Sequence, residues 1–247
     1  MSIGAGNRFG VGFRFVDLFG GIGGFRLALE SLGGRCVMSS EIERHARATY
    51  RMNFNEWPRG DIRRILDEDV PEHDILCGGF PCQSFSIAGK GMGFTDEARG
   101  TLFFEIARIV RARRPAAVFL ENVAHLRNHD GGRTFAVIVR TLEECGYSVF
   151  WQVLDASRYG SPTSRKRVYI VCFRSDLGVR DFTFPVPTDE PVRLADVLVP
   201  DEKARPWALQ SHHSVTLEPV PPSYAVQRRT QGTPTITAAG TFQPLEY

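Results

Sequence analysis

The alternation of short apolar runs with amphipathic stretches is the feature that most restricts the fold of this chain. It extends from residue 13 to about residue 173. Short apolar runs are typical of buried strands, and the amphipathic stretches between them are typical of helices that cover a sheet. This order predicts an α/β fold, with helices packed around a mainly parallel sheet.

The positions of the elements follow from the same pattern. We expect parallel strands at residues 15–19, 36–40, 74–77 and 117–120. We expect helices at residues 25–32, 45–54, 102–113 and 134–145. Two final strands, at residues 149–154 and 168–173, are expected to pair as an antiparallel hairpin with a long connection.

The composition changes at both ends of this region. Residues 1–12 are rich in glycine and lack the apolar segment of a secretory signal, so we expect a flexible extension there. Ten of the fifteen prolines lie beyond residue 175, where the amphipathic pattern fades. Residues 13–175 are therefore expected to form one domain, and residues 176–247 a loop-rich segment of another.

The bulk composition excludes several classes of protein. No apolar run approaches the roughly 18 residues of a membrane span. The five cysteines are odd in number and form no repeated C-x-x-C pairs, so we expect no zinc or other metal site. A cytoplasmic protein with reduced thiols is expected. The net charge of +2 neither requires nor excludes a nucleic-acid partner.

A glycine-rich loop joins the first expected strand to the first expected helix, at residues 17–24. Glycines there let the backbone approach a ligand, and the helix N-terminus favours an anionic group. Glu41 follows about 20 residues later, where an acidic residue binds ribose hydroxyls in such folds. Asp61 is placed to reach the adenine side. A tight turn without a ligand is the alternative, but with Glu41 the loop favours a nucleoside cofactor.

The loop departs from the dinucleotide-binding pattern G-x-G-x-x-G. Gly21 and Gly23 match its start, but Arg26 stands where the third glycine is required. A nicotinamide-dependent dehydrogenase is therefore disfavoured. Phe19, at the tip of the first strand, is suited either to contact a sulfonium cation or simply to pack in the core.

Cys82 lies in a setting that a buried structural cysteine does not need. The loop at residues 78–86 leaves the carboxyl end of a strand, where ligands bind in open α/β sheets. Pro81 stiffens the backbone, and the flanking glycines and serines leave the thiol accessible. A thiolate in this position is suited to attack an electron-poor ring. Residues 88–100 contain four glycines and are expected to form a mobile lid over the substrate.

Glu121 follows another expected strand at the same edge of the sheet. A carboxylate there can protonate or hydrogen-bond a ring nitrogen, although it can also cap the next helix. Arg165 and Arg167 are two residues apart, so in an extended backbone they point the same way. They are suited to bind a phosphate or a base oxygen, and a solvated basic loop is the alternative.

These four pieces, in this order, resemble the signatures of the cytosine-5 DNA methyltransferases. The signatures D-L-F-x-G-x-G-G, P-C-Q, E-N-V and R-x-R occur at residues 17–24, 81–83, 121–123 and 165–167, and the likeness runs from residue 13 to residue 177. The resemblance implies a Rossmann-like S-adenosylmethionine-dependent methyltransferase fold. It makes residues 13–175 the catalytic and cofactor-binding domain and residues 176–247 a partial start of a target-recognition region.

The resemblance also implies a reaction. A cytosine is flipped out of double-stranded DNA, and Cys82 adds to its carbon 6 while Glu121 assists at ring nitrogen 3. Arg167 holds the base oxygen, Arg165 helps to order the closed loop, and carbon 5 takes the methyl group of S-adenosylmethionine. The implied cofactor-binding residues are Phe19, Gly21, Gly23, Gly24, Glu41, Ile42, Asp61, Ile62, Pro81 and Leu102. The implied nucleic-acid-binding residues are Gln83, Ser86, Lys90, Arg99, Arg165 and Arg167.

The chain departs from the family pattern in three ways. Thr163 stands where the family usually has glutamine, and Ala88 replaces a serine of the loop that enters the DNA. The last two family motifs have no counterpart in this sequence. The resemblance therefore implies a poor or inactive enzyme that needs a complementary polypeptide. A split enzyme, in which a second polypeptide supplies the rest of the recognition region, is one explanation, and a truncated gene is the other.

Two other functions stay open at this point. A tRNA-acting branch of the family shares the cysteine chemistry, and the order of the motifs does not exclude it. A noncatalytic remnant that binds nucleic acid is disfavoured by the intact Cys82, Glu121 and Arg167. The main prediction is a DNA (cytosine-5)-methyltransferase in a bacterial restriction-modification setting.

Overall fold

The computed structural model describes residues 12–81, 102–188, 192–198 and 233–234. Contacts between Cα atoms divide the protein into two compact units. The first unit consists of Met1–Val153 and Arg167–Phe184, and the second of Leu154–Lys166 and Pro185–Tyr247. The glycine loop and Glu121 belong to the first unit.

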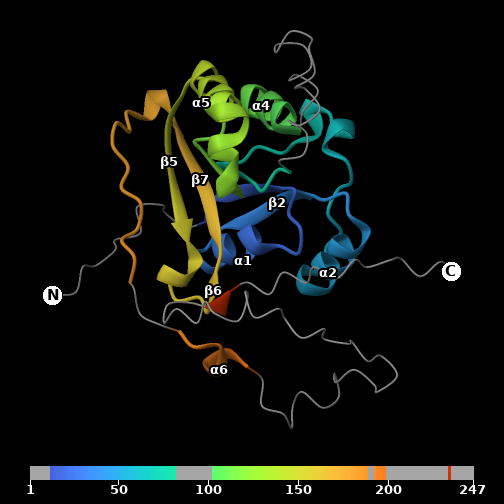
Figure 1. Ribbon diagram of the computed structural model, residues 1–247. Coiled ribbons are helices and arrows are strands. Elements are labelled where there is room, and N and C mark those ends of the chain that lie inside the picture. Colours follow the sequence, from blue (N-terminus) through green and yellow to red (C-terminus); the bar gives the residue numbers. More distant parts are fainter. Residues whose placement is uncertain (1–11, 82–101, 189–191, 199–232, 235–247) are drawn as a thin grey trace. The chain divides into compact units, whose positions relative to one another are not determined.

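Within the described ranges, six strands form one sheet in the order β2-β1-β3-β4-β7-β5 (Figure 1). They are β1 Arg14–Leu18, β2 Arg35–Ser40, β3 Ile75–Gly78, β4 Ala117–Val123, β5 Tyr147–Asp155 and β7 Lys166–Arg174. Strand β1 is parallel to β2 and β3, β3 is parallel to β4, and β7 is antiparallel to β4. The prediction of a mainly parallel α/β fold is confirmed.

The main helices of the first unit alternate with these strands along the chain. They are α1 Gly24–Ser31, α2 Arg44–Phe54, α4 Leu102–Arg113 and α5 Arg133–Glu144, each within one residue of its predicted range. Local signals explain the bounds of α2. The carboxylate of Glu43 accepts hydrogen bonds from the backbone of His45 and Ala46, and Asn55 ends the helix with a φ of 57°.

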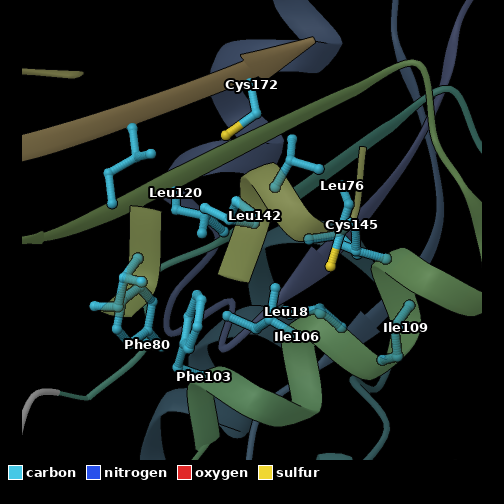
Figure 2. Close-up of a cluster of buried hydrophobic side chains, with 14 of the residues drawn as sticks. Leu18, Leu76, Phe80, Phe103, Ile106, Ile109, Leu120, Leu142, Cys145 and Cys172 are labelled. Atoms are coloured by element: carbon cyan, nitrogen blue, oxygen red, sulfur yellow. The ribbon is translucent and has the colours of Figure 1, made fainter. Parts of the chain in front are cut away.

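The larger part of the core lies on one face of the sheet. Alternate residues of a strand point to opposite faces, so Leu18, Leu76 and Leu120 share this face. They belong to one buried cluster with Ile106 of α4 and Leu142 of α5 (Figure 2). All five side chains are fully buried, and burial of each contributes roughly 1.5–3 kcal/mol to folding. This layer therefore holds the ends of β1, β3 and β4 in a fixed arrangement.

The opposite face of β1 and β3 packs against α1. Phe15 and Cys77 form a second buried cluster with Leu29 of that helix. Asp17, two residues beyond Phe15, is also fully buried. Burial raises the pKa of Asp17 to about 7, because the ionised carboxylate loses its hydration. A carboxyl group that is close to its pKa at neutral pH thus lies at the base of the glycine loop.

Strand β4 is longer than the sequence pattern predicts. We expected it to end at residue 120, but it continues through Glu121 and Asn122 to Val123. The strand extends because these residues pair with β7, down to Val123 opposite Arg167. Glu121 is therefore a strand residue, not the first residue of a loop.

Short 3-10 helices, which the pattern also does not predict, fill the connections. In the first unit they include η1 Ile62–Arg64, η2 Asp67–Asp69, η4 Ala124–Gly132 and η6 Ser175–Leu177, and in the second unit η5 Ala156–Arg158. In the second unit, β6 Thr163–Ser164 pairs in parallel with β8 Thr233–Pro234, and α6 covers Leu194–Val197. Over the described part of the chain, no helix is both long and apolar enough to cross a lipid bilayer.

Candidate functional site

A cavity of about 300 Å³ lies beyond the carboxyl ends of β1, β2 and β3. Its lining consists of Phe19, Ser40, Glu41, Ile42, Gly60, Asp61, Ile62, Arg63, Gly79, Pro81 and Leu102. Seven of these are among the ten residues predicted to bind the cofactor. Of the other three, Gly21 and Gly23 lie in the adjoining loop and Gly24 is the first residue of α1. The structure thus brings the predicted set together, and a volume near 300 Å³ is at the lower end of ligand pockets.

The glycine loop turns sharply where β1 ends. Phe19 has a φ of 55°, and Gly21 and Gly23 also have positive φ values, of 56° and 99°. A positive φ is uncommon for a bulky side chain, and such strained residues cluster at ligand sites. The backbone of Phe19 and Gly20 is held by hydrogen bonds to the Ser40 side chain and carbonyl, at 3.4 and 2.9 Å. The end of β2 therefore fixes the loop that borders the cavity.

Glu41 also links the glycine loop to the segment that follows β2. Its carboxylate accepts three backbone hydrogen bonds, from Gly21 at 2.9 Å and from Ile42 and Glu43 at 2.8 Å each. An ionised carboxylate offers about four lone-pair positions, so one acceptor position is left for a ligand hydroxyl. This geometry suits the predicted contact with a ribose.

Asp61 lies on the other wall of the cavity, at the start of η1. Its carboxylate accepts a hydrogen bond from the backbone of Arg63 at 3.0 Å and pairs with the Arg63 guanidinium at 2.6 Å. These hydrogen bonds from Arg63 lower the pKa of Asp61, so its side chain is an anionic acceptor at neutral pH. Sequence reasoning missed Arg63, because nothing local marks it as a cavity residue.

Glu121 and Arg167 form an ion pair at the end of β4. The Nε atom of Arg167 lies 2.8 Å from an Oε atom of Glu121, and both side chains are largely buried. A Cβ atom built on Gly79 would lie 3.5 Å from the second carboxylate oxygen of Glu121. Gly79 also lines the cavity. The structure therefore places the predicted catalytic carboxylate against the backbone that leads to Cys82.

Asn122 is a functional candidate that the sequence analysis did not single out. Its Nδ2 donates a buried hydrogen bond to the carbonyl of Phe80 at 2.7 Å, and its Oδ1 accepts one from the backbone of Val123 at 2.8 Å. The side chain is almost completely buried. Asn122 thus ties the end of β4 to the backbone two residues before Cys82. The E-N-V signature, which includes Asn122, was the sequence signal that could have pointed to this residue.

We expect replacement of Asn122 by alanine to slow catalysis and to destabilise the protein. It leaves the Phe80 carbonyl buried without its donor, which costs about 1–3 kcal/mol. Thermal unfolding and single-turnover methyl transfer would measure the two effects. Asn128→Ala is the matched control, because Asn128 is exposed on η4. A variant with Asn122→Ala that turns over at the rate of the parent would refute the assignment.

Arg165 belongs to the second unit and lies between β6 and β7. Its backbone N–H donates to the carboxylate of Asp155 at 3.0 Å, and its carbonyl accepts from Ala156 at 3.1 Å. Asp155 also accepts hydrogen bonds from the hydroxyls of Ser157 and Ser164, at 3.0 Å each. Asp155 therefore organises the segment that carries Arg165. The predicted common orientation of Arg165 and Arg167 stays a prediction.

Five predicted residues of the nucleophile and DNA-contacting loop lie outside the described residues. They are Cys82, Gln83, Ser86, Lys90 and Arg99.

The four cysteines within the described ranges are poor nucleophiles. Cys77, Cys145 and Cys172 are buried and Cys36 is half-buried, and each is a free thiol. Burial raises the pKa of all four, to about 11 for Cys36. Because the thiolate is the reactive form, these side chains stay protonated and inert at neutral pH.

The fold and the cavity define a class of protein. An open, mainly parallel sheet with a glycine loop, a glutamate after the second strand and a cavity at the strand ends is typical of α/β proteins that bind a nucleoside cofactor. The sequence profile of the C-5 cytosine-specific DNA methylases matches residues 13–231. The chain belongs to this family, as its motifs predicted.

Curated relatives agree with this assignment. The chain is 52% identical over 192 residues to the type II methyltransferase M.HhaI of Haemophilus parahaemolyticus, which covers 78% of this chain and 58% of the relative. It is 44% identical over 219 residues to M.NgoBI of Neisseria gonorrhoeae, with coverages of 87% and 68%. For M.HpaII of Haemophilus parainfluenzae the identity is 51% over 191 residues, with coverages of 75% and 52%. The chain thus spans between about half and two thirds of these relatives.

Solved structures show the same fold. A protein described as a DNA modification methyltransferase of an Escherichia coli prophage superposes with a TM-score of 0.63 and 26% identity, over 76% of this chain and 56% of that one. A DNMT2 mutant of Spodoptera frugiperda gives a TM-score of 0.60 at 24% identity, over 73% of this chain and 57% of that one. The predicted methyltransferase fold is therefore confirmed.

Proposed function

We propose that this protein transfers a methyl group from S-adenosylmethionine to carbon 5 of cytosine in double-stranded DNA. The observation that carries the proposal is the position of the Glu121–Arg167 pair beside Gly79, which also lines the cavity of about 300 Å³. A site for a nucleoside cofactor and a carboxylate suited to act on a base thus meet at one segment of backbone. Membership of the C-5 cytosine-specific family supports this assignment.

The cavity fits the chemistry of S-adenosylmethionine. Ile42, Ile62 and Leu102 provide apolar surface for an adenine ring, and Glu41 retains one acceptor position for the ribose. The Phe19 ring lies at the strand tip, where an aromatic face favours a cation such as a sulfonium. Gly21 and Gly23 give the backbone the close approach that the methionine part requires. When bound, this cofactor supplies an electrophilic methyl group.

The protein's own residues have separate tasks in the proposed reaction. The Cys82 thiolate forms a bond to carbon 6 of the flipped cytosine, while the Glu121 carboxylate takes up a proton from water and passes it to ring nitrogen 3. The electron pair that reaches carbon 5 forms the new bond to the methyl group, while the bond between that methyl group and the sulfonium sulfur breaks and its electron pair stays on the sulfur as a neutral thioether. Transfer of the carbon 5 proton to water then re-forms the ring double bond and expels Cys82 as a thiolate, and the proton on ring nitrogen 3 returns to Glu121. Arg167, paired with Glu121, orients the carboxylate and holds the base oxygen.

The DNA-facing part of the proposal rests on the family. Gln83, Ser86, Lys90, Arg99 and Arg165 are assigned to nucleic-acid contacts by their places in the family motifs. The relatives are named as type II methyltransferases, which supports a restriction-modification setting. The second polypeptide that the sequence analysis predicts finds no support in these comparisons, and it stays a prediction. An RNA substrate is not favoured by them.

Cofactor binding is the first test of this function. We expect the purified protein to bind S-adenosylmethionine, and Glu41→Ala to weaken binding by about tenfold or more, the scale for a hydrogen bond to a charged group. Isothermal titration calorimetry gives both values. Glu143→Ala, on the exposed surface of α5, is the matched control. Failure of the parent protein to bind the cofactor would overturn the proposal.

Transfer to nucleic acid is the second test. The protein is incubated with cofactor labelled in the methyl group and with duplex DNA or tRNA, alone and with the C-terminal portion of a relative added. Label recovered as 5-methylcytosine from DNA is the expected result. Label recovered only from tRNA would assign the protein to the other substrate class.

A further inference from the structure

Arg26 is the residue that breaks the dinucleotide-binding glycine pattern, and it is buried within α1. Its guanidinium makes two ion pairs, to Glu30 on the same helix at 2.8 Å and to Glu56, just beyond α2, at 2.7 Å. Its Nη1 atom is also 3.5 Å from the hydroxyl of Tyr50. A buried cation is stable only when it is paired in this way. The pairing reaches from the helix after the glycine loop to the end of the next helix.

Two aromatic rings of α2 complete the surroundings of this guanidinium. Its central carbon lies 4.5 Å from the ring centroid of Phe54 and 5.6 Å from that of Tyr50. The two rings are themselves 4.6 Å apart. Attraction between a cation and the faces of aromatic rings therefore holds the last turn of α2 against Arg26.

The last turn of α2 packs directly against the glycine loop. A Cβ atom built on Gly23 would lie only 2.1 Å from a ring carbon of Phe54, so nothing larger than glycine fits there without displacing the ring. The neighbouring Asn53 donates from its side-chain amide to the carbonyl of Ile22 at 3.0 Å. Arg26 thus fixes the Phe54 ring, and the ring and Asn53 fix Ile22 and Gly23.

We propose that Arg26 is a positioning residue for the cofactor: by clamping Phe54 beneath Gly23, it sets the shape of the glycine loop that receives the cofactor. This inference rests on the proposed function. Arg26 does not line the cavity, so it acts only through the loop. Both carboxylate partners are partly exposed, with side-chain exposures of 36% and 59%, so they remain hydrated when the arginine is removed. The effect on the loop is therefore expected to exceed the effect on folding.

The test compares cofactor affinity with folding in the same variants. Arg26→Met keeps a long, unbranched side chain but removes the charge. In this variant we expect the dissociation constant for S-adenosylmethionine to rise about tenfold or more. Arg26→Lys keeps the charge without the planar guanidinium. Its dissociation constant is expected to lie between those of the parent protein and Arg26→Met. Arg133→Met is the matched control, because it removes an exposed arginine paired with Asp130. Its affinity should equal that of the parent protein.

Calorimetry separates this role from a purely structural one. An irreversibly unfolded fraction would lower the number of binding sites without changing the dissociation constant, and a reversibly unfolded fraction would show as incomplete folding in a thermal-unfolding measurement without ligand. A displaced loop raises the dissociation constant at full stoichiometry in a variant that is fully folded before ligand is added. Under turnover, the KM for the cofactor is expected to rise while kcat at saturation changes less than twofold.

Should Arg26→Met fail to fold, two other variants test the inference in the same way. They are Arg26→Lys and Phe54→Leu, which removes the ring but keeps an apolar side chain. Folded variants with the affinity of the parent protein would overturn this inference, whereas a parent protein that binds no cofactor would overturn the proposed function instead.

Discussion

Replacement of Cys82 by alanine is expected to abolish both methyl transfer and the covalent complex with DNA that contains 5-fluorocytosine. The fluorine at carbon 5 cannot leave as a proton does, so the enzyme should remain attached to the base after methyl transfer. Cys82 is the predicted nucleophile because of its place in the Pro-Cys-Gln motif. The four described cysteines support this choice, because burial raises the pKa of each thiol. Loss of a covalent nucleophile typically removes nearly all of the rate enhancement.

The complex is measured as a band of reduced mobility that survives denaturation. Cys145→Ala is the control, since Cys145 is buried in the same core cluster as Leu142 and lies outside the loop. That variant should form the complex, although loss of a buried thiol lowers its stability somewhat. A covalent complex that persists in Cys82→Ala would show that another group attacks the base.

The fold could be predicted from the sequence because its signals are local. Each main helix was placed within one residue from its amphipathic pattern. For α2 the structure adds local end signals, the capping carboxylate of Glu43 and the left-handed Asn55. The length of β4 could not be predicted in the same way. Its last residues extend because they pair with β7, and Val123 meets Arg167 only in the folded sheet.

The residues of the candidate site also differ in whether local sequence signals reveal them. Glu41 and Asp61 follow the motif spacing of the family, and the structure places both in the cavity lining. Asn122 and Arg26 were not assigned a role, because their partners are distant in sequence. The Asn122 amide reaches a carbonyl 42 residues earlier, and Arg26 pairs with a carboxylate 30 residues later. Neither contact leaves a periodic pattern that a single sequence could reveal.

Glu121→Gln is expected to fold and to bind cofactor, yet to lose about 10²-fold or more in the rate of methyl transfer, the usual scale for a missing general acid. Glutamine has nearly the shape of glutamate, and its side-chain oxygen can still accept the hydrogen bond from Arg167 Nε at the present 2.8 Å. The ion pair becomes a neutral-acceptor hydrogen bond, and the amide cannot deliver a proton to ring nitrogen 3. Rates are measured under single turnover. Glu144→Gln, which changes an exposed carboxylate of α5 paired with Arg140, is the control.

The ion pair also predicts how the rate losses of Glu121 and Arg167 variants combine. If Arg167 acts by orienting the Glu121 carboxylate, the two side chains work as a unit, and their substitutions should not be additive. Arg167→Met alone is then expected to slow methyl transfer, whereas Arg167→Met added to Glu121→Gln should cost much less than it does in the parent protein. A folded Glu121→Gln protein with a near-normal rate would remove Glu121 from the chemistry. Fully additive losses would instead show that Arg167 acts only through its proposed contact with the base oxygen and does not orient Glu121.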